Sequence, residues 1–181
     1  MFQTEIALNP EMTEAERTQA IREAFNSNRS QMTLMLAHQL KINEVEIIRS
    51  LEGDLARELD FSRWEEIIRA FEPLGNVHVI VSNGATTIEV FGQFGKFTNT
   101  DGFLNIRTQS LDMHIRSWEL ASVFAFRKPS HLDGHESLSF QFFDRRGNAA
   151  FKVFLNFGGK DPAPELVKTY NTLIETFKNK A

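Results

Sequence analysis

The residues best suited to chemistry in this 181-residue sequence lie in residues 102–116, GFLNIRTQSLDMHIR. The pattern predicts two short strands around a polar turn, and side chains along a strand point alternately to its two faces. Asp112, His114 and Arg116 therefore share one face, and the apolar residues between them share the other. An imidazole between a carboxylate and a guanidinium, on a sheet rich in phenylalanine, is the best candidate for a binding site in this chain.

His114 fits two interpretations. In the functional one it is an axial ligand of a metal cofactor, and Arg107 or Arg116 binds a carboxylate group of that cofactor. In the structural one it is a half-exposed strand histidine paired with Asp112. The spacing of these residues does not decide between the two.

The other four histidines lie in less informative patterns. None of the five histidines forms a helical H-x-x-x-H pair, which would place two zinc ligands on one helical face, because His131 and His135 have this spacing in a loop. His131 and His135 fall in a polar loop, where solvated side chains are expected, and His38 is expected on a helix surface. His78 belongs to the first predicted strand and shares a face with Ser82.

Familiar catalytic motifs are absent from the sequence. It contains no cysteine, which excludes disulfides, a thiolate nucleophile and cysteine-bound zinc or iron–sulfur sites. It has no G-x-S-x-G elbow, no P-loop and no G-x-G-x-x-G fingerprint. The run Gly158-Gly159-Lys160 is expected to connect a strand to a helix rather than to bind phosphate, because the rest of a P-loop is missing.

The composition predicts a globular, cytosolic protein. Hydrophobic residues make up 41% of the chain and charged residues 24%. The formal net charge of −4 argues against a protein whose main work is binding nucleic acid or anionic lipid. No stretch approaches the ~20 apolar residues of a membrane span, and the acidic start does not resemble a signal peptide. The 17 phenylalanines supply apolar surface without a polar group, which suits a flat aromatic ligand as well as a core.

Residues 1–74 are predicted to form a helical N-terminal portion. Residues 36–51 resemble a helix-turn-helix, for which the alternatives are DNA recognition and a plain helical hairpin. Three glutamates on the second helix would repel phosphates, so we expect the hairpin. Three capping residues, each followed three positions later by glutamate, predict helix N-termini: Thr13 with Glu16, Asn43 with Glu46, and Ser62 with Glu65.

Residues 75–181 are predicted to form a largely antiparallel sheet and a closing helix. About eight short strands follow one another without helical crossovers, and Asn83-Gly84 between two of them predicts a β-hairpin. The fold class is therefore α+β, with a boundary near residues 73–76 and both portions in one compact unit. The closing helix is expected to pack on the sheet through Leu166, Tyr170, Leu173, Ile174 and Phe177.

Residues 74–160 resemble the HutX/ChuX-like family of intracellular heme utilization proteins. The matching segments are LGNVHVIV, IEVFG, GFLNIR, MHIR and SFQFFDRRGNAAFKVFL, followed by Asp161, and the helical segment LAHQLKINEVEIIRSLEG is also similar to the family's. The most specific segment is a strand, a charged turn with Gly-Asn, and the strand KVFL. The resemblance implies an N-terminal helical segment, a large antiparallel sheet and a C-terminal packing helix, which together correspond to half of a duplicated HemS/ChuS-type protein.

The resemblance also implies a function. Members are cytosolic, typically homodimeric proteins that bind heme and pass it to a heme-degrading enzyme of the same uptake system. His114 falls where the family often has a histidine implicated in heme binding. The position of a second family histidine holds Ser82, with His78 nearest, and Phe103 replaces a tyrosine that some relatives carry. The iron is then expected to take His114 alone, or His114 with water or His78.

The chemistry of heme fits these residues. Heme is a flat apolar macrocycle with two carboxylates and an iron that accepts imidazole. The phenylalanine-rich sheet supplies apolar surface, and Arg107, Arg116 and Lys152 supply cations for the propionates. We therefore expect a cytoplasmic heme carrier without nucleic-acid or membrane partners, and not an enzyme. The alternatives are a heme-degrading enzyme and a helix-turn-helix regulator.

Overall fold

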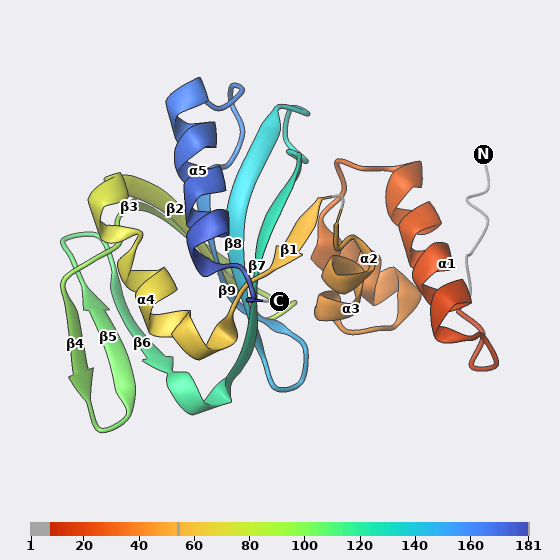
Figure 1. The fold of residues 1–181 in the computed structure, drawn as a ribbon, viewed down its shortest axis with the longest axis horizontal. Coiled ribbons are helices and arrows are strands. Elements are labelled where there is room, and N and C mark those ends of the chain that lie inside the picture. The colour runs from red at the N-terminus through yellow and green to blue at the C-terminus, as the bar shows by residue number, and fades with distance from the viewer. Residues whose placement is uncertain (1–7, 54, 181) are drawn as a thin grey trace.

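The computed structural model describes residues 8–53 and 55–180, which form two antiparallel sheets and five α-helices (Figure 1). This arrangement confirms the predicted α+β class. The helices are α1 (Glu14–Ser27), α2 (Thr33–Leu40), α3 (Glu44–Ser50), α4 (Trp64–Arg69) and α5 (Pro164–Phe177), with 3-10 turns at Phe61–Arg63, Glu72–Leu74 and Ser117–Glu119. The strands are β1 (Ala56–Glu58), β2 (Asn76–Ser82), β3 (Thr87–Gln93), β4 (Phe97–Thr100), β5 (Phe103–Arg107), β6 (Asp112–Arg116), β7 (Leu120–Pro129), β8 (Glu136–Asp144) and β9 (Ala149–Asn156).

The strands divide into two sheets rather than the single sheet expected. The large sheet has the order β1-β7-β8-β9-β2-β3, and the small sheet has the order β4-β5-β6. All neighbouring strands within these sheets are antiparallel, as predicted. The chain leaves the large sheet after β3 and turns at Lys96, whose φ of 58° is left-handed. Residues 93–97, QFGKF, therefore run from the last residue of β3 to the first residue of β4.

The predicted hairpins are confirmed. In the small sheet Asn105 pairs with His114, and the polar side chains of β6 face outward. In the large sheet β2 and β3 are joined at the predicted turn, where Asn83 Oδ1 accepts hydrogen bonds from the amides of Ala85 and Thr86. Gly84 adopts a φ of 87° there, which suits glycine.

The N-terminal portion differs from the expectation in one element. Capping boxes at Thr13 and Asn43 are confirmed. The chain is not helical throughout, because residues 56–58 form β1 and pair with Phe124, Ala125 and Phe126 of β7. A strand of three residues is too short to produce a recognisable alternation of side chains.

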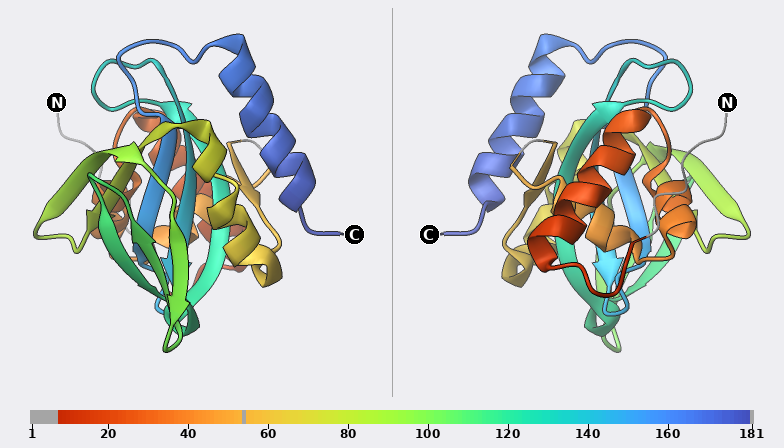
Figure 2. Two further views of the ribbon diagram at one scale, coloured as in Figure 1. Left: turned by 90° about the vertical axis from the view of Figure 1, so that its left-hand side faces the viewer. Right: turned by 90° about the vertical axis from the view of Figure 1, so that its right-hand side faces the viewer.

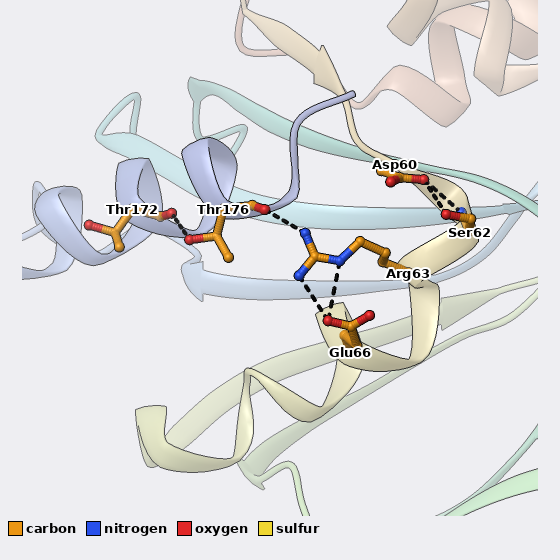
Figure 3. A network of polar contacts seen from close by, with 6 residues as sticks. All are labelled: Asp60, Ser62, Arg63, Glu66, Thr172 and Thr176. Carbon is orange, nitrogen blue, oxygen red and sulfur yellow. Dashed lines mark hydrogen bonds and ion pairs between the residues drawn. The ribbon is translucent and has the colours of Figure 1, made fainter. Parts of the chain in front are cut away.

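The third predicted cap, at Ser62, is wrong. Asp60 caps this segment instead: its Oδ1 accepts hydrogen bonds from Ser62 N (3.1 Å) and Ser62 Oγ (2.6 Å) (Figure 3). The carboxylate therefore begins a 3-10 turn, and α4 starts only after it. Arg63 links this turn to the end of α5, since it donates to Thr176 O at 2.7 Å and to Glu66 Oε2 at 2.8 Å.

Each face of the large sheet has its own core around β7 and β8, whereas β3 at the edge of the sheet is mostly exposed. Along β7, Val123 and Ala125 point into a core shared with α4, α5 and the small sheet. Phe124 and Phe126 point into a second core shared with α1, α2 and α3, and Phe143 of β8 joins them. Figure 2 shows the small sheet and α4 on one side and α1 on the other. We call α1–α3 the helical unit; α4 packs with the sheet in the first core.

The closing helix packs largely as predicted. Its side chains belong to the first core, but Val167 takes the place expected for Leu166. The packed residues are Val167, Tyr170, Leu173, Ile174 and Phe177.

The second core should carry the docking of the helical unit on the sheet. Phe143 has no exposed surface, and we expect Phe143→Ala to lower the free energy of unfolding by about 3–5 kcal/mol because it leaves a cavity. Urea denaturation measures this change. Ile88→Ala is the control, since Ile88 is 60% exposed and should change stability by no more than about 0.5 kcal/mol. Equal effects of the two substitutions would contradict this view of the core.

Candidate functional site

A cleft lies between the helical unit and the large sheet. The helical unit packs on the part of the sheet face that carries the phenylalanines of β7 and β8. Beside this contact, β2, β3, β8 and β9 line a cavity of about 450 Å³, which α2 and Glu44, the first residue of α3, border on the other side. This volume falls in the usual range for small-molecule sites, ~300–1,000 Å³.

The cleft has apolar and aromatic walls. Met32 and Leu34 contribute from the helical unit, and Ile80, Phe154 and Phe157 contribute from the sheet and the residue just after β9. The Phe157 ring lies 4.9 Å from the Phe154 ring between centroids. These walls suit a flat, apolar ligand.

The floor of the cleft is polar because of the sequence of β8. Alternate residues of this strand face opposite cores, and the serines and glutamine on the cleft side are all buried. Ser137 Oγ donates to Lys128 O at 2.9 Å, and Ser139 Oγ donates to Phe126 O at 3.1 Å. The cleft-facing residues are Ser137, Ser139 and Gln141, and those facing the first core are Leu138, Phe140 and Phe142.

A buried ion pair joins the helical unit to the sheet at the cleft. Lys152 Nζ of β9 lies 2.5 Å from Glu44 Oε1, and the Glu44 side chain is only 2% exposed. Thr33 Oγ1 donates to the same carboxylate oxygen at 2.6 Å. Burying two charges is favourable only with such additional hydrogen bonds. Because Thr33 begins α2 and Glu44 begins α3, the contact forms only when both helices lie where they are observed.

A second lysine enters the cleft without a carboxylate. Lys128 Nζ donates to Ser30 O at 2.9 Å and to Pro129 O at 2.7 Å, and no ion pair of Lys128 occurs within residues 8–53 and 55–180. Burial, with a further contribution from the charge of Lys152, lowers the pKa of Lys128 from 10.5 to about 8. At neutral pH the ammonium is still mostly charged.

Three histidines surround the cleft. His38 lines it and lies against the β2–β3 turn, where a Cβ atom added to Gly84 would be 3.3 Å from His38 Cε1. His131 also lines it, and burial and the charge of Lys128 lower the pKa of His131, which favours its neutral form. His78 stands at the margin: its ring centroid is 4.2 Å from that of Phe157, and its Nε2 is 3.2 Å from Glu89 Oε2.

His114 lies elsewhere, on the outward side of the small sheet. His114 Nδ1 is 2.6 Å from Asn105 Oδ1, and His114 Nε2 is 3.6 Å from Asp112 Oδ1. The amide oxygen can only accept, so it fixes the proton on Nδ1 and leaves Nε2 with a lone pair. The side chain is 56% exposed. We call this surface the outer histidine face; it consists of Phe103, Asn105, Arg107, Asp112, His114 and Arg116.

The outer histidine face offers cations and aromatic surface around the imidazole. Arg107 Nη2 lies 3.2 Å from Asp112 Oδ2, and the Arg107 side chain is 74% exposed. Arg116 lies over the Phe103 ring at 6.0 Å, and this ring contacts Trp118 edge-to-face at 5.3 Å. Phe103, which replaces a possible tyrosine ligand, thus has an apolar role.

The five predicted site residues fall on two separate surfaces. Lys152 lines the cleft and His78 stands at its margin, whereas Arg107, His114 and Arg116 lie on the outer histidine face. The first core separates the two surfaces, because it contains the residues that alternate with His78 and with His114. Sheets packed face to face lie about 10 Å apart, and both imidazoles point outward. One iron ion therefore cannot contact both rings within one chain.

The sequence reasoning missed several residues of the cleft. His38, Glu44, Lys128, His131 and Gln141 all line it. Polar residues at every second position of an otherwise apolar strand, as in β8, were the one available signal, since such a face does not belong to an ordinary core. The lysines and histidines come from separate elements, and only the tertiary structure brings them together.

Two features of the described residues complete the picture. None of the helices in residues 8–53 and 55–180 is both long and apolar enough to cross a membrane. Within the same residues, no group of three or more histidine, aspartate or glutamate side chains could hold a metal ion.

Comparison with known proteins identifies relatives of this chain. The family model described as Haem utilisation ChuX/HutX matches residues 57–173. The chain is 29% identical over 134 residues to the intracellular heme transport protein HutX of Vibrio cholerae, a match that covers 73% of this chain and 67% of that protein.

Solved structures show the same fold. The heme-binding protein ChuX superposes with a TM-score of 0.74 at 19% identity, covering 86% of this chain and 97% of ChuX. Holo-PhuS, a heme-binding protein from Pseudomonas aeruginosa, superposes with a TM-score of 0.74 at 22% identity and covers 93% of this chain. This chain spans 46% of PhuS, or about half of its length.

The buried ammonium of Lys128 predicts a stability change with pH. Its pKa is about 8 in the folded protein against 10.5 as the ordinary value, so between these values the unfolded chain binds more protons and stability rises with pH. The unfolding free energy of the native protein minus that of Lys128→Met should rise by up to about 1.4 kcal/mol per pH unit above pH ~8. Urea denaturation of both proteins from pH 7 to pH 10 measures it. A constant difference would show that Lys128 keeps its ordinary pKa.

Proposed function

The chain belongs to the Haem utilisation ChuX/HutX family, and from this premise we propose that it binds heme inside the cell and carries it to another protein. The named relative from Vibrio cholerae is an intracellular heme transport protein. A heme-degrading enzyme that accepts the cargo is part of this proposal.

The cleft is the observation that carries the proposal. Its walls are aromatic and apolar, as a macrocycle requires, and its floor holds two lysines. Heme presents the matching chemistry, an apolar ring with carboxylates at one edge.

The outer histidine face supplies the best iron ligand. An axial histidine usually has its other ring nitrogen hydrogen-bonded, which fixes its tautomer. His114 meets this condition through Asn105, and its Nε2, 3.6 Å from Asp112 Oδ1, is the atom that would bind iron. Arg107 and Arg116 beside it are exposed enough to reach propionates.

A homodimer reconciles the two surfaces. His114 and the cleft cannot meet within one chain, but a second copy can present its outer histidine face to the cleft of the first. Each heme would then lie in the cleft of one copy, with its iron bound by His114 of the partner subunit. His78, at the margin of the cleft, is the candidate for the opposite axial position.

The regulator alternative has little support in the fold. Five of the seven residues of α3 are buried, including Glu44, and Glu46 pairs with Arg17 of α1 at 2.6 Å. A recognition helix must expose its surface to the major groove. This helix is instead packed between α1 and the sheet.

Hemin titration followed by absorption spectroscopy tests the proposal. We expect saturable binding of one heme per chain with a Soret shift, and His114→Ala should weaken it at least about tenfold through loss of the axial ligand. His135→Ala is the matched control, because the His135 side chain pairs with Asp161 and does not line the cleft. Binding that ignores His114→Ala would move the iron to His78, and no saturable binding would contradict the carrier.

The same heme complex separates a carrier from an enzyme. With a reductant and oxygen, a heme-degrading enzyme would release iron and a defined tetrapyrrole product, whereas a carrier should yield the heme intact to an added acceptor such as apomyoglobin. Release of that product at a catalytic rate would make the enzyme the better description.

A further inference from the structure

The charges at the floor of the cleft do not balance. Lys152 is neutralised by Glu44, but Lys128 has only two carbonyl oxygens as partners. The remaining carboxylates that line the cleft are engaged elsewhere: Asp144 accepts from the amides of the β8–β9 turn, and Glu89 pairs with His78. Among the described residues that line the cleft, Lys128 is therefore the lysine without a paired carboxylate.

The third donor of the Lys128 ammonium is the natural place for an anion. An ammonium has three N–H groups, and the two hydrogen bonds of Lys128 in the described chain go to Ser30 O and Pro129 O. Buried cations are costly without a charged partner. The same burial lowers the pKa of Lys128, because it disfavours the charged ammonium. An anionic ligand would offset this free-energy cost by pairing with the ammonium.

Gln141 provides a second, independent sign of a ligand. Its side chain lines the cleft and is 2% exposed, yet its Oε1 has no hydrogen-bond partner in the described chain. The orientation of the amide is fixed, because Ser139 Oγ donates its proton to Phe126 O and so can only accept from Gln141 Nε2, at 3.1 Å. An acceptor oxygen is thus left unpaired at the floor, where it costs about 1–3 kcal/mol.

We propose that the floor of the cleft is a carboxylate subsite, where Lys128 donates directly to a ligand carboxylate, and Gln141, farther along the floor, marks a second polar position. The ligand class is an apolar tetrapyrrole with a free carboxylate, which enters the cleft carboxylate first. This inference rests on the proposed binding of heme in the cleft and names the group by which the cleft orients it.

Metal-free porphyrins test the subsite without the iron. Protoporphyrin IX has two free carboxylates, and its dimethyl ester has the same ring with none. Fluorescence anisotropy of the porphyrin itself gives the affinity of each. The native protein should bind the free acid at least about tenfold more tightly than the ester, the effect of one charge-assisted hydrogen bond.

The variants separate recognition from folding. Lys128→Met should weaken binding of the free acid by about tenfold and leave the affinity for the ester unchanged. Lys128→Arg keeps the charge and should retain most of the preference. Lys178→Met is the matched control, because Lys178 pairs with Glu175 on the surface of α5. A merely structural role of Lys128 would weaken acid and ester alike.

The outcomes distinguish this inference from the proposed function. Equal affinity of the native protein for acid and ester, or a preference that survives Lys128→Met, would overturn the carboxylate subsite while hemin binding stands. Failure of the native protein to bind either hemin or protoporphyrin would overturn the proposed function itself.

Discussion

The docking of the helical unit on one half of a sheet face is the constraint on which the site depends. Phe124, Phe126 and Phe143 attach the unit through apolar contact. At the edge of that contact the side chains of the sheet become polar. There the ion pair between Lys152 and Glu44 joins the helical unit to the sheet. The unit is thereby held at a fixed position beside β9 and β2, and the uncovered half of the face becomes a cleft rather than open surface.

Buried polar groups make this arrangement costly for stability. An apolar replacement of a buried ion pair is often neutral or stabilising, and an unpaired acceptor such as Gln141 Oε1 is unfavourable. A core with stability as its main requirement would not place serines, a glutamine and two lysines on one face of the three central strands β7, β8 and β9. Their presence beside aromatic walls fits a surface that a ligand completes, with the ligand supplying the missing charge and donor.

Much of the fold could be predicted from the sequence, because local rules determine it. The caps at Thr13 and Asn43, the β2–β3 turn and the outward face of β6 follow from residues close together in the chain. Asp60 was missed because two capping residues lie two positions apart and the carboxylate forms the cap. The separation into two sheets depends on a backbone turn at Lys96, which no side-chain pattern predicts.

The site was harder to predict than the fold. His114 was identified from its neighbours on a strand, and its hydrogen bond to Asn105 fits the expected ligand chemistry. Lys128, Gln141 and His38 come from three elements, and their sequence neighbours give no indication that they share a cleft. Strand alternation could place His78 and His114 each on a face, but only the position of the first core shows that those faces are opposite.

A mixed dimer tests most directly the claim that heme lies between the cleft of one copy and His114 of the partner subunit. One copy would carry His114→Ala, and the other would carry Ile80→Trp, which fills the cleft. Each variant alone should bind heme weakly. The hybrid, purified through two different tags, should bind one heme per dimer with native affinity, because one intact cleft meets one intact His114. A hybrid as weak as its parents would contradict the shared site and place the whole of it within a single chain.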